Sequence, residues 1–386
     1  MPTHHEELVI IGGNVYSEHG ARKHFRSGLE QQMNDLAHAF SRTFHYSPKS
    51  IERFAGFVFD DAVTVQTFSE RLHESHHELW RRKKEYWQRM KEIHAAHPNA
   101  IFLVYIPDSY IGLLAALYLK KKKAKWFVRV TSNQMAEMRA RRNSWQGAVA
   151  YYSFFPWHFL FMRWLLRGVP QIYTGKKVFY KNKYAFSVCS SSIRNEDIAE
   201  RTVREREKKV IYYVGRYDAV KGLPFLLAAL PLIRHPVTLK IIGFGEAADE
   251  RRIRELIAAS PRKNDIELLG YVPFGPALFA HYDAADMMVI PTVYETQGKS
   301  FLEAMARGAA VIASRTGGMP LFIKDGENGM LVPPKDPRAI AAVVDRVAGD
   351  PVLQAKLVAR GYETARKNTI EMITATTLRV IDTFFS

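Results

Sequence analysis

Short apolar segments alternate with helical patterns along most of the chain, and this alternation limits the folds available to it. Each apolar segment is four to seven residues long and leads into a turn or a helical pattern. Strands that alternate with helices form a parallel sheet with helices on both faces. The predicted strands are Leu8–Ile11, Ala100–Ile106, Trp126–Thr131, Val210–Val214, Thr238–Ile242, Ile266–Leu269, Met287–Ile290 and Ala310–Ala313, and helices are predicted at residues 29–40, Ile111–Lys122, Leu223–Ile233, Glu250–Ala259, Ala277–Tyr282 and Phe301–Arg307.

A polar stretch, Tyr180–Lys208, divides this pattern into two blocks, and 386 residues suffice for two hydrophobic cores. We therefore expect an α/β fold of two tandem Rossmann-like domains with parallel sheets, at residues 1–200 and 201–365. Residues 366–386 are expected to form a C-terminal helix that packs back on the first domain, because the last helical pattern breaks near Asn368. The charged segment Glu70–Ala96 is expected to be a long exposed helix.

The chain has one cysteine, Cys189, which excludes a disulfide framework and a zinc site built from cysteines. No signal peptide fits the beginning of the sequence, and no apolar run reaches the ~18 residues of an ordinary membrane-spanning helix. These features favour a cytoplasmic protein. His73, His76 and His77 are interpreted as solvated surface, since no second cluster of metal ligands accompanies them.

The stretch Pro291–Gly308 carries the most specific chemistry. Glu295 and Glu303 stand eight positions apart, with Gly298 between them shortly before a predicted helix. Free backbone N–H groups and the positive end of a helix attract an anion at such a turn. The carboxylates can accept hydrogen bonds from sugar or ribose hydroxyls beside that anion. The alternative is an acidic pair that only complements the helix dipole.

Further basic and glycine-rich turns follow other predicted strands. Arg216 and Lys221 lie five residues apart after one strand, where both can reach a diphosphate at the carboxyl edge of a parallel sheet. Gly243 and Gly245 follow the next strand.

Together these motifs resemble the retaining glycosyltransferases of the large family 4, which have the GT-B fold. The resemblance is strong over residues 210–335 and weaker in the first domain. It implies that Glu295 and Glu303 are the family's E-x7-E pair, with Glu295 on the transferring sugar and Glu303 on the ribose. It also implies that Arg216 and Lys221 bind the diphosphate. The other implied contacts of the donor are Gly12, Gly13, Gly243, Gly245, Gly298, Lys299 and Ser300.

The sequence departs from the family pattern at two places. Gln297 stands where the family often has an aromatic residue before the loop glycine, which alters how the sugar is held. Many members also have a histidine after the third or fourth strand of the first domain, where this chain has Ser132–Gln134. Asp108, Arg129 and Asn133 are candidate replacements for that histidine, although Asp108 equally suits a helix N-cap.

The predicted mechanism needs no metal and no cofactor besides the nucleotide-diphosphate sugar, which is a co-substrate. Negative charge builds on the leaving diphosphate, and Arg216 and Lys221 stabilise it. No Asp-x-Asp pattern occurs, so the sequence indicates no divalent metal clamp. Retention of the anomeric configuration is implied by the resemblance alone.

Basic and aromatic residues gather in the first half of the chain. Residues 1–200 hold 29 Lys and Arg against 18 Asp and Glu, a net charge of +11 within a total of +16. The aromatic segment Ala148–Arg167 lies between basic residues, which suits a bilayer interface or, alternatively, the core of the first domain. The interface interpretation, with Lys120–Lys123, predicts a peripheral protein on the inner face of the cytoplasmic membrane with a lipid-linked or other glycan acceptor.

Three other functions fit parts of the sequence. The fold also suits a sugar-nucleotide epimerase or a phosphorylase, although Arg216, Lys221, Glu295 and Glu303 favour transfer. A degenerate subunit that only binds a partner is the alternative that the missing histidine raises. Nucleic-acid binding is not expected, because no recognised module accompanies the basic charge.

Overall fold

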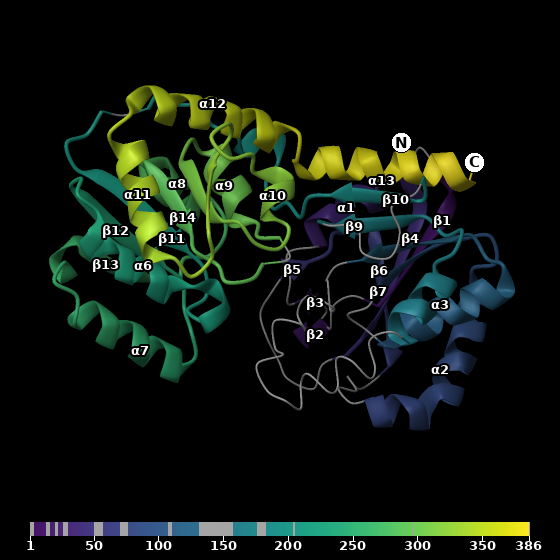
Figure 1. Ribbon diagram of the computed structural model, residues 1–386. Coiled ribbons are helices and arrows are strands. Elements are labelled where there is room, and N and C mark those ends of the chain that lie inside the picture. Colours follow the sequence, from purple (N-terminus) through teal and green to yellow (C-terminus); the bar gives the residue numbers. More distant parts are fainter. Residues whose placement is uncertain are drawn as a thin grey trace. The chain divides into compact units, whose positions relative to one another are not determined.

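The computed structural model describes residues 4–12, 16–19, 22–25, 30–49, 57–69, 76–106, 110–130, 157–175, 183–203, 205–295 and 297–385. The chain forms two compact units (Figure 1). Unit 1 comprises Met1–Val188 and Ile370–Ser386, and unit 2 comprises Cys189–Thr369. Each unit is built on a parallel sheet with helices, so the predicted α/β fold class is confirmed.

Unit 1 contains a seven-stranded parallel sheet in the order β10-β9-β8-β7-β1-β4-β6. The central strands are buried on both faces, as in Ile101–Ile106, because helices cover each side. The strands are β1 (His4–Ile11), β4 (Phe40–Pro48), β6 (Val63–Ser69), β7 (Ile101–Ile106), β8 (Trp126–Val130), β9 (Gln171–Thr174) and β10 (Ala185–Val188).

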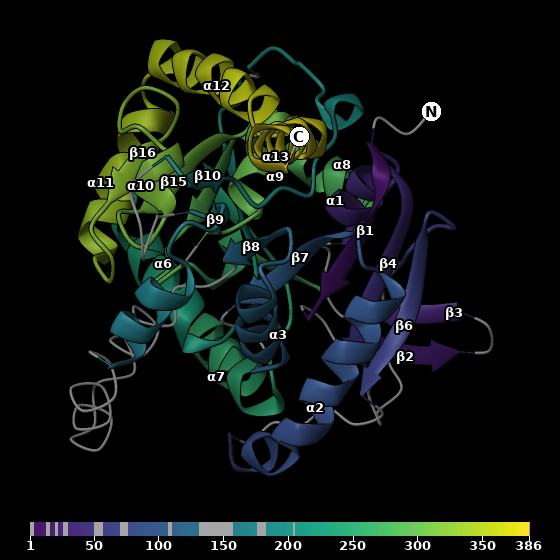
Figure 2. The same ribbon diagram turned by 90° about the vertical axis from the view of Figure 1, so that its right-hand side faces the viewer.

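Helices α2 (His76–Ala96) and α3 (Tyr110–Lys122) cover one face of this sheet, together with a helix at residues 157–165. Helices α1 (Glu30–Ala37) and α13 (Ile370–Phe385) cover the other face (Figure 2). A small antiparallel sheet of β2 (Tyr16–His19), β3 (Arg22–Phe25) and β5 (Phe57–Val58) belongs to the same unit and was not predicted.

Unit 2 contains a six-stranded parallel sheet in the order β13-β12-β11-β14-β15-β16. Hydrophobic clusters fill both of its faces. The strands are β11 (Lys209–Val214), β12 (Val237–Ile242), β13 (Ile266–Gly270), β14 (Met287–Ile290), β15 (Ala310–Ser314) and β16 (Met330–Val332), and the helices are α6 (Leu223–Ala229), α7 (Ala247–Ala258), α8 (Pro276–Ala284), α9 (Ser300–Ala306), α10 (Met319–Phe322), α11 (Pro337–Ala348) and α12 (Pro351–Arg366).

The unit boundaries differ from the predicted residues 200 and 365. Unit 1 ends at Val188, because the polar-looking segment after it is buried in unit 2, with Cys189 1% and Ile193 0% exposed. The last helical pattern is interrupted at residues 367–369, between α12 and α13. Helix α13 packs through Ile373 and Ile381 into the core of unit 1.

Two helices near the predicted positions differ in detail. Helix α2 is not exposed all round, because Tyr86, Met90 and Ile93 are buried against the sheet. Phe40 belongs to strand β4 rather than to the first helix, which ends at Ala37.

Candidate functional site

The turn after β11 holds both of the predicted phosphate-binding cations. Asp218 caps a short 3-10 turn, Ala219–Lys221, by accepting hydrogen bonds from the backbone N–H groups of Val220 and Lys221 at 3.1 and 3.2 Å. Arg216 forms an ion pair with Asp218 at 2.9 Å, and its side chain is 64% exposed. The turn therefore leaves the Arg216 side chain at the surface and fixes the backbone of Lys221.

Gly222 allows this turn to lie directly against the end of β14. Its φ of +71° is in the left-handed region, and a Cβ atom there would lie 2.0 Å from the carbonyl oxygen of Pro291. The backbone N–H of Val293 donates to the carbonyl of Val220 at 2.8 Å, which joins the two loops.

Lys221 and Glu295 form an ion pair across these two loops. Their side chains are 27% and 16% exposed, so solvent screens the pair less than it screens Arg216 and Asp218. The structure thus brings together two residues, 74 positions apart in sequence, that were predicted to act on the same ligand.

The loop that carries Glu295 rests on the Thr316–Gly318 turn. The backbone N–H of Gly318 donates to the carbonyl of Glu295 at 3.1 Å, and the Thr316 hydroxyl donates to the carbonyl of Val293 at 3.2 Å. A Cβ atom at Gly317 would lie only 1.6 Å from the backbone carbonyl oxygen of Glu295. This second glycine contact was not predicted, although the glycine pair itself was visible in the sequence.

Glu303 lies in a different environment from Glu295. Its side chain is buried in α9, its Oε1 accepts a hydrogen bond from the Ser192 hydroxyl, and its Oε2 accepts one from the Tyr282 hydroxyl at 2.8 Å. Burial raises the pKa of Glu303, while the two hydroxyl donors lower it. Each carboxylate oxygen retains a lone pair for another donor.

Gly298, Lys299 and Ser300 form the entrance to α9, which starts at Ser300. A Cβ atom at Gly298 would make only ordinary contact with the Glu295 side chain, at 3.8 Å. Packing within unit 2 therefore does not require glycine at this position, and the lack of a side chain leaves space next to Glu295.

The loops after β12 and β13 extend the same edge of the sheet. A Cβ atom at Gly243 would lie 1.8 Å from the carbonyl oxygen of Gly215, and one at Gly245 would lie 3.0 Å from the Tyr217 side chain. The N–H of Gly243 donates to the Gly270 carbonyl at 2.8 Å, and the N–H of Tyr217 donates to the Phe244 carbonyl at 2.9 Å. These contacts place the three loops side by side.

Two exposed aromatic side chains on these loops were missed by the sequence analysis. Phe244 is 48% exposed and Tyr271 is 65% exposed, and their rings meet edge to face with centroids 5.4 Å apart. Each residue directly follows a glycine with positive φ, Gly243 or Gly270. Aromatic residues after strand-end glycines were the signal that would have found them.

In unit 1, Gly12 directly follows strand β1 and has a φ of +80°. Its N–H donates to the Tyr46 carbonyl at 3.2 Å, and its own carbonyl lies 3.0 Å from Nε2 of His45. Burial lowers the pKa of His45 to about 4, so the ring is neutral at pH 7 and Nε2 donates to Gly12. Gly13, Asp108 and Asn133 lie outside the described residues.

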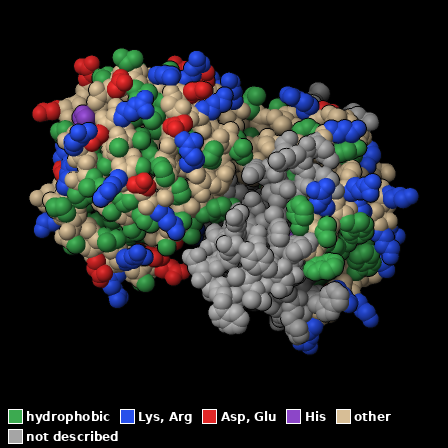
Figure 3. All heavy atoms as spheres, viewed as in Figure 1, with side chains coloured by type: hydrophobic (Ala, Val, Ile, Leu, Met, Phe, Trp, Pro, Cys, Tyr) green, Lys and Arg blue, Asp and Glu red, His purple; other side chains and the backbone are tan. Residues whose placement is uncertain are grey.

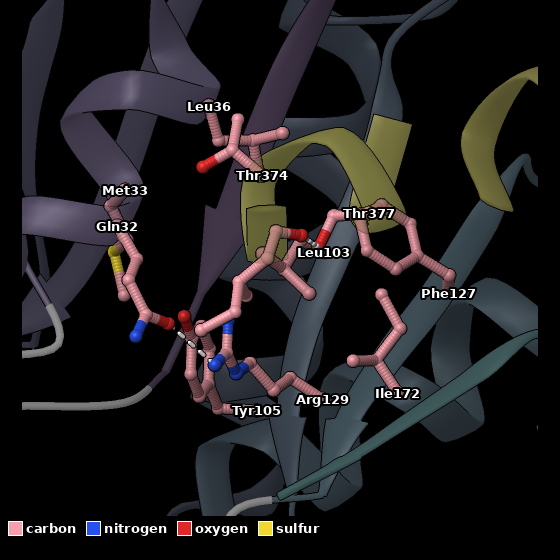
Figure 4. A pocket seen from close by; sticks show the side chains of 11 residues that line it. Gln32, Met33, Leu36, Leu103, Tyr105, Phe127, Arg129, Ile172, Thr374 and Thr377 are labelled. Atoms are coloured by element: carbon pink, nitrogen blue, oxygen red, sulfur yellow. Dashed lines mark hydrogen bonds between the residues drawn. The ribbon is translucent and has the colours of Figure 1, made fainter. Parts of the chain in front are cut away.

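Arg129 points into the interior of unit 1 (Figure 4). Its Nη2 donates to Oε1 of Gln32 at 2.6 Å, and its side chain is 6% exposed. The small cavity beside it has a volume of about 10 Å³ and is lined by residues of α1, α13 and the sheet. This position gives Arg129 a partner within the unit, while its predicted contact with the donor stays a prediction.

No group of three or more His, Cys, Asp or Glu side chains suited to a metal ion occurs in the part of the chain that the structure describes. Within the same residues, no helix is long and apolar enough to cross a membrane.

The helix at residues 157–165 divides its apolar residues between the core and the surface. Met162 and Leu165 are fully buried, whereas Trp157, Leu160 and Trp164 are 74%, 58% and 55% exposed. Nζ of Lys120 lies 5.6 Å from the centroid of the Trp164 ring. Figure 3 shows hydrophobic side chains bordered by Lys and Arg near the position of α3 in Figure 1. Met162 and Leu165 thus fit the prediction of a core segment, and Trp157, Leu160 and Trp164 fit the prediction of a bilayer interface.

Residues 208–350 match the family described as Glycosyl transferases group 1, and this match lies within unit 2. An uncharacterized glycosyltransferase of Methanocaldococcus jannaschii is 40% identical over 146 residues, which cover 37% of each chain. The phosphatidyl-myo-inositol mannosyltransferase of Mycolicibacterium smegmatis is 34% identical over 183 residues, 46% of each chain. The matched part thus spans less than half the length of these relatives.

Solved structures share the fold over nearly the whole chain. The sucrose-phosphate synthase of Thermosynechococcus elongatus has a TM-score of 0.73 at 19% identity and covers 98% of this chain and 99% of its own. Anabaena HepE in complex with UDP has a TM-score of 0.69 at 14% identity and covers 98% and 100%. These similarities identify the architecture as the predicted GT-B one.

Gly222→Ala is expected to destabilise the protein far more than Gly326→Ala. Both glycines have a φ of +71°, but a Cβ atom meets the Pro291 oxygen at the first and nothing within 4 Å at the second. Backbone strain alone costs about 1–2 kcal/mol, and the added collision at Gly222 makes the loss larger. Urea denaturation of both variants measures the difference, and equal losses would contradict the close approach of the two loops.

Proposed function

We propose that the protein is a glycosyltransferase that moves a sugar from a nucleotide-diphosphate sugar to a glycan or lipid-linked acceptor, with retention and without a metal ion. The observation that carries this proposal is the Lys221–Glu295 ion pair at the carboxyl edge of the unit 2 sheet, with Arg216 on the same turn. The pair lies inside the segment that matches Glycosyl transferases group 1. Retention and membership of family 4 rest on the sequence resemblance.

The proposed mechanism depends on where charge develops. As the bond between sugar and diphosphate breaks, negative charge grows on the leaving phosphate, and fixed cations there lower the barrier. Arg216 is exposed and reaches outward, while Lys221 is held by its capped turn. When the diphosphate binds, Lys221 shares its three N–H donors between the phosphate and Glu295. Glu295 is thereby held beside the transferring sugar.

We place the nucleobase at the β13 end of this edge. The strand order puts the loops of β13, β12 and β11 in sequence, so Tyr271 and Phe244 come before Arg216 and the Lys221–Glu295 pair. An extended donor laid along the edge then has its base on the aromatic rings, its diphosphate on the cations and its sugar at Glu295. Aromatic rings bind any base through stacking.

The acceptor side is proposed to lie on unit 1 and to involve a membrane surface. Exposed Trp157, Leu160 and Trp164 next to Lys120 suit the interface of an anionic bilayer. This supports a peripheral protein on the inner face of the cytoplasmic membrane, with a lipid-linked acceptor. A degenerate binding subunit is the competing proposal, since no replacement for the first-domain histidine has been identified.

Transfer activity is the direct test, with UDP, GDP and ADP sugars as donors and excess chelator present. Lys221→Ala and Arg216→Ala are each expected to lower kcat/KM about 30- to 1000-fold, because one lost cation costs about 2–4 kcal/mol of transition-state stabilisation. Lys240→Ala is the matched control, since it removes another Lys–Glu pair of the same unit, with Glu267 at 2.9 Å.

Three outcomes would overturn parts of this proposal. A wild-type protein that binds donors but transfers no sugar supports the degenerate subunit. Turnover that stops in chelator and returns with Mg²⁺ or Mn²⁺ would disprove metal independence. If Arg216→Ala and Lys221→Ala are as active as Lys240→Ala, the two cations do not stabilise the leaving diphosphate.

Base stacking is tested by comparing a nucleoside diphosphate with inorganic pyrophosphate in calorimetric titrations. Phe244→Ala and Tyr271→Ala are expected to weaken the nucleotide about tenfold and to leave pyrophosphate unchanged, since stacking contributes about 1–3 kcal/mol per base. Arg216→Ala weakens both ligands. Phe274→Ala is the control, because Phe274 is similarly exposed, at 42%, but packs on Phe279. Equal weakening of both ligands by Phe244→Ala would contradict this placement.

Membrane binding is tested by sedimentation with vesicles of anionic and of neutral lipid. The wild-type protein is expected to sediment with the anionic vesicles, and added salt is expected to weaken binding, because exposed charges are screened beyond about 8 Å at physiological ionic strength. Serine at Trp157, Leu160 and Trp164 should abolish binding without unfolding, because all three are exposed. Val352→Ser, at an 81% exposed residue of unit 2, should bind normally. Wild-type protein that ignores anionic vesicles at low salt points to a soluble acceptor.

A further inference from the structure

The segment that leads from unit 1 into unit 2 runs through the interior beside the Glu295 loop. Residues 189–193 directly follow β10, and all five are buried, with exposed fractions of 0 to 8%. The backbone and side chains of residues 189–193 therefore place polar groups in the interior, where such groups are normally hydrogen-bonded. Their partners therefore show what this segment holds in place.

Gln297 is one of these partners, and both ends of its side-chain amide are used. Its Nε2 donates to Sγ of Cys189, and its Oε1 accepts from the backbone N–H of Ser190 at 2.9 Å. The side chain is only 8% exposed. A buried amide with both ends engaged fixes the backbone that carries it, because losing either partner leaves a polar group unsatisfied.

The position of Gln297 in the loop gives this anchor its importance. Glu295 lies two residues before Gln297, and its backbone carbonyl accepts a hydrogen bond from the N–H of Gly318. In the described part of unit 2, no backbone hydrogen bond joins Gln297 or Gly298 to another residue, and Gly298 has no side chain to pack. The Gln297 amide is thus the anchor on the α9 side of Glu295.

The same segment also holds the second glutamate. The Ser192 hydroxyl donates to Oε1 of Glu303, and Tyr282 occupies the other oxygen. Residues 189–192 therefore contact the stretch from Glu295 to Glu303 at two points, one through Gln297 and one through Glu303.

We propose that Gln297 is a positioning residue, which acts with Cys189 and Ser190 to hold Glu295 in register with Lys221 for sugar transfer. This inference rests on the proposed function. It assigns a role to the residue that stands where the family resemblance implies an aromatic side chain, and it makes the single cysteine a hydrogen-bond acceptor. Burial raises the pKa of the Cys189 thiol well above its usual range, so the thiol stays protonated at neutral pH and is no nucleophile.

A double-mutant cycle on kcat tests the proposal. Gln297→Met keeps the volume and removes both hydrogen bonds, and Cys189→Ala removes one acceptor. Each is expected to lower kcat about tenfold, with the donor KM and the affinity for the nucleoside diphosphate within about twofold of wild type, because Arg216 and Lys221 are untouched. The double variant should be no slower than Gln297→Met alone, because Gln297→Met already removes the hydrogen bond that Cys189→Ala would remove. Cys189→Ser restores an acceptor and should keep wild-type kcat.

The controls separate positioning from loss of structure. Circular dichroism and urea denaturation establish that each variant is folded, and Cys189→Ser and Cys189→Ala still test the anchor if Gln297→Met does not fold. An active wild-type enzyme with unchanged kcat in Gln297→Met, or with additive effects in the double variant, overturns the positioning role alone. A wild-type protein without transfer activity on any donor overturns the proposed function and this inference together.

Discussion

The close approach of loops at one edge of the unit 2 sheet is the constraint on which the site depends. Parallel strands deliver their carboxyl ends to the same edge, but adjacent loops touch only if no side chain separates them. At Gly222, Gly243 and Gly317 an added Cβ would lie within 2.0 Å of a neighbouring carbonyl oxygen. These three contacts bring Lys221, Arg216 and Glu295 onto a continuous backbone surface. The backbone that carries the two cations and the carboxylate is thus positioned by the packing of these loops.

The fold was largely predictable from sequence because its signals are local. Apolar runs such as Met287–Ile290 between helical patterns specify buried parallel strands, and each predicted strand of unit 2 appears in the sheet. The short strands β2, β3 and β5 were missed because two to four residues carry no periodicity, and β4, β6, β9, β10 and β16 were not predicted either. The unit boundary was displaced because residues 189–193 look polar in sequence, yet their serines are buried, and Ser190 and Ser192 have partners more than 100 residues away, in Gln297 and Glu303.

The site was predictable in its residue types but not in its pairings. The spacing of Glu295 and Glu303 and the basic turn at Arg216 and Lys221 are visible in sequence. Their environments are not, because Glu295 faces a lysine across two loops while Glu303 is buried between hydroxyls. The role of Gln297 depends on Ser190, 107 residues away in the chain, and no local pattern encodes such a contact.

Glu295 and Glu303 differ in their charged surroundings, and this difference suits them to different functions. The Lys221 ammonium lies against Glu295 at a partly exposed position, so a bound diphosphate would compete for the cation and shift the balance of charge at this carboxylate. Glu303 forms no ion pair in the described part of unit 2, although the charge of Lys299 helps to lower its pKa, and burial still raises that pKa despite the two hydroxyl donors. A ligand hydroxyl that donates to Glu303 would offset more of the cost of burial. One glutamate is therefore suited to respond to charge and the other to bind neutral hydroxyls, which agrees with a ligand that carries both phosphate and sugar.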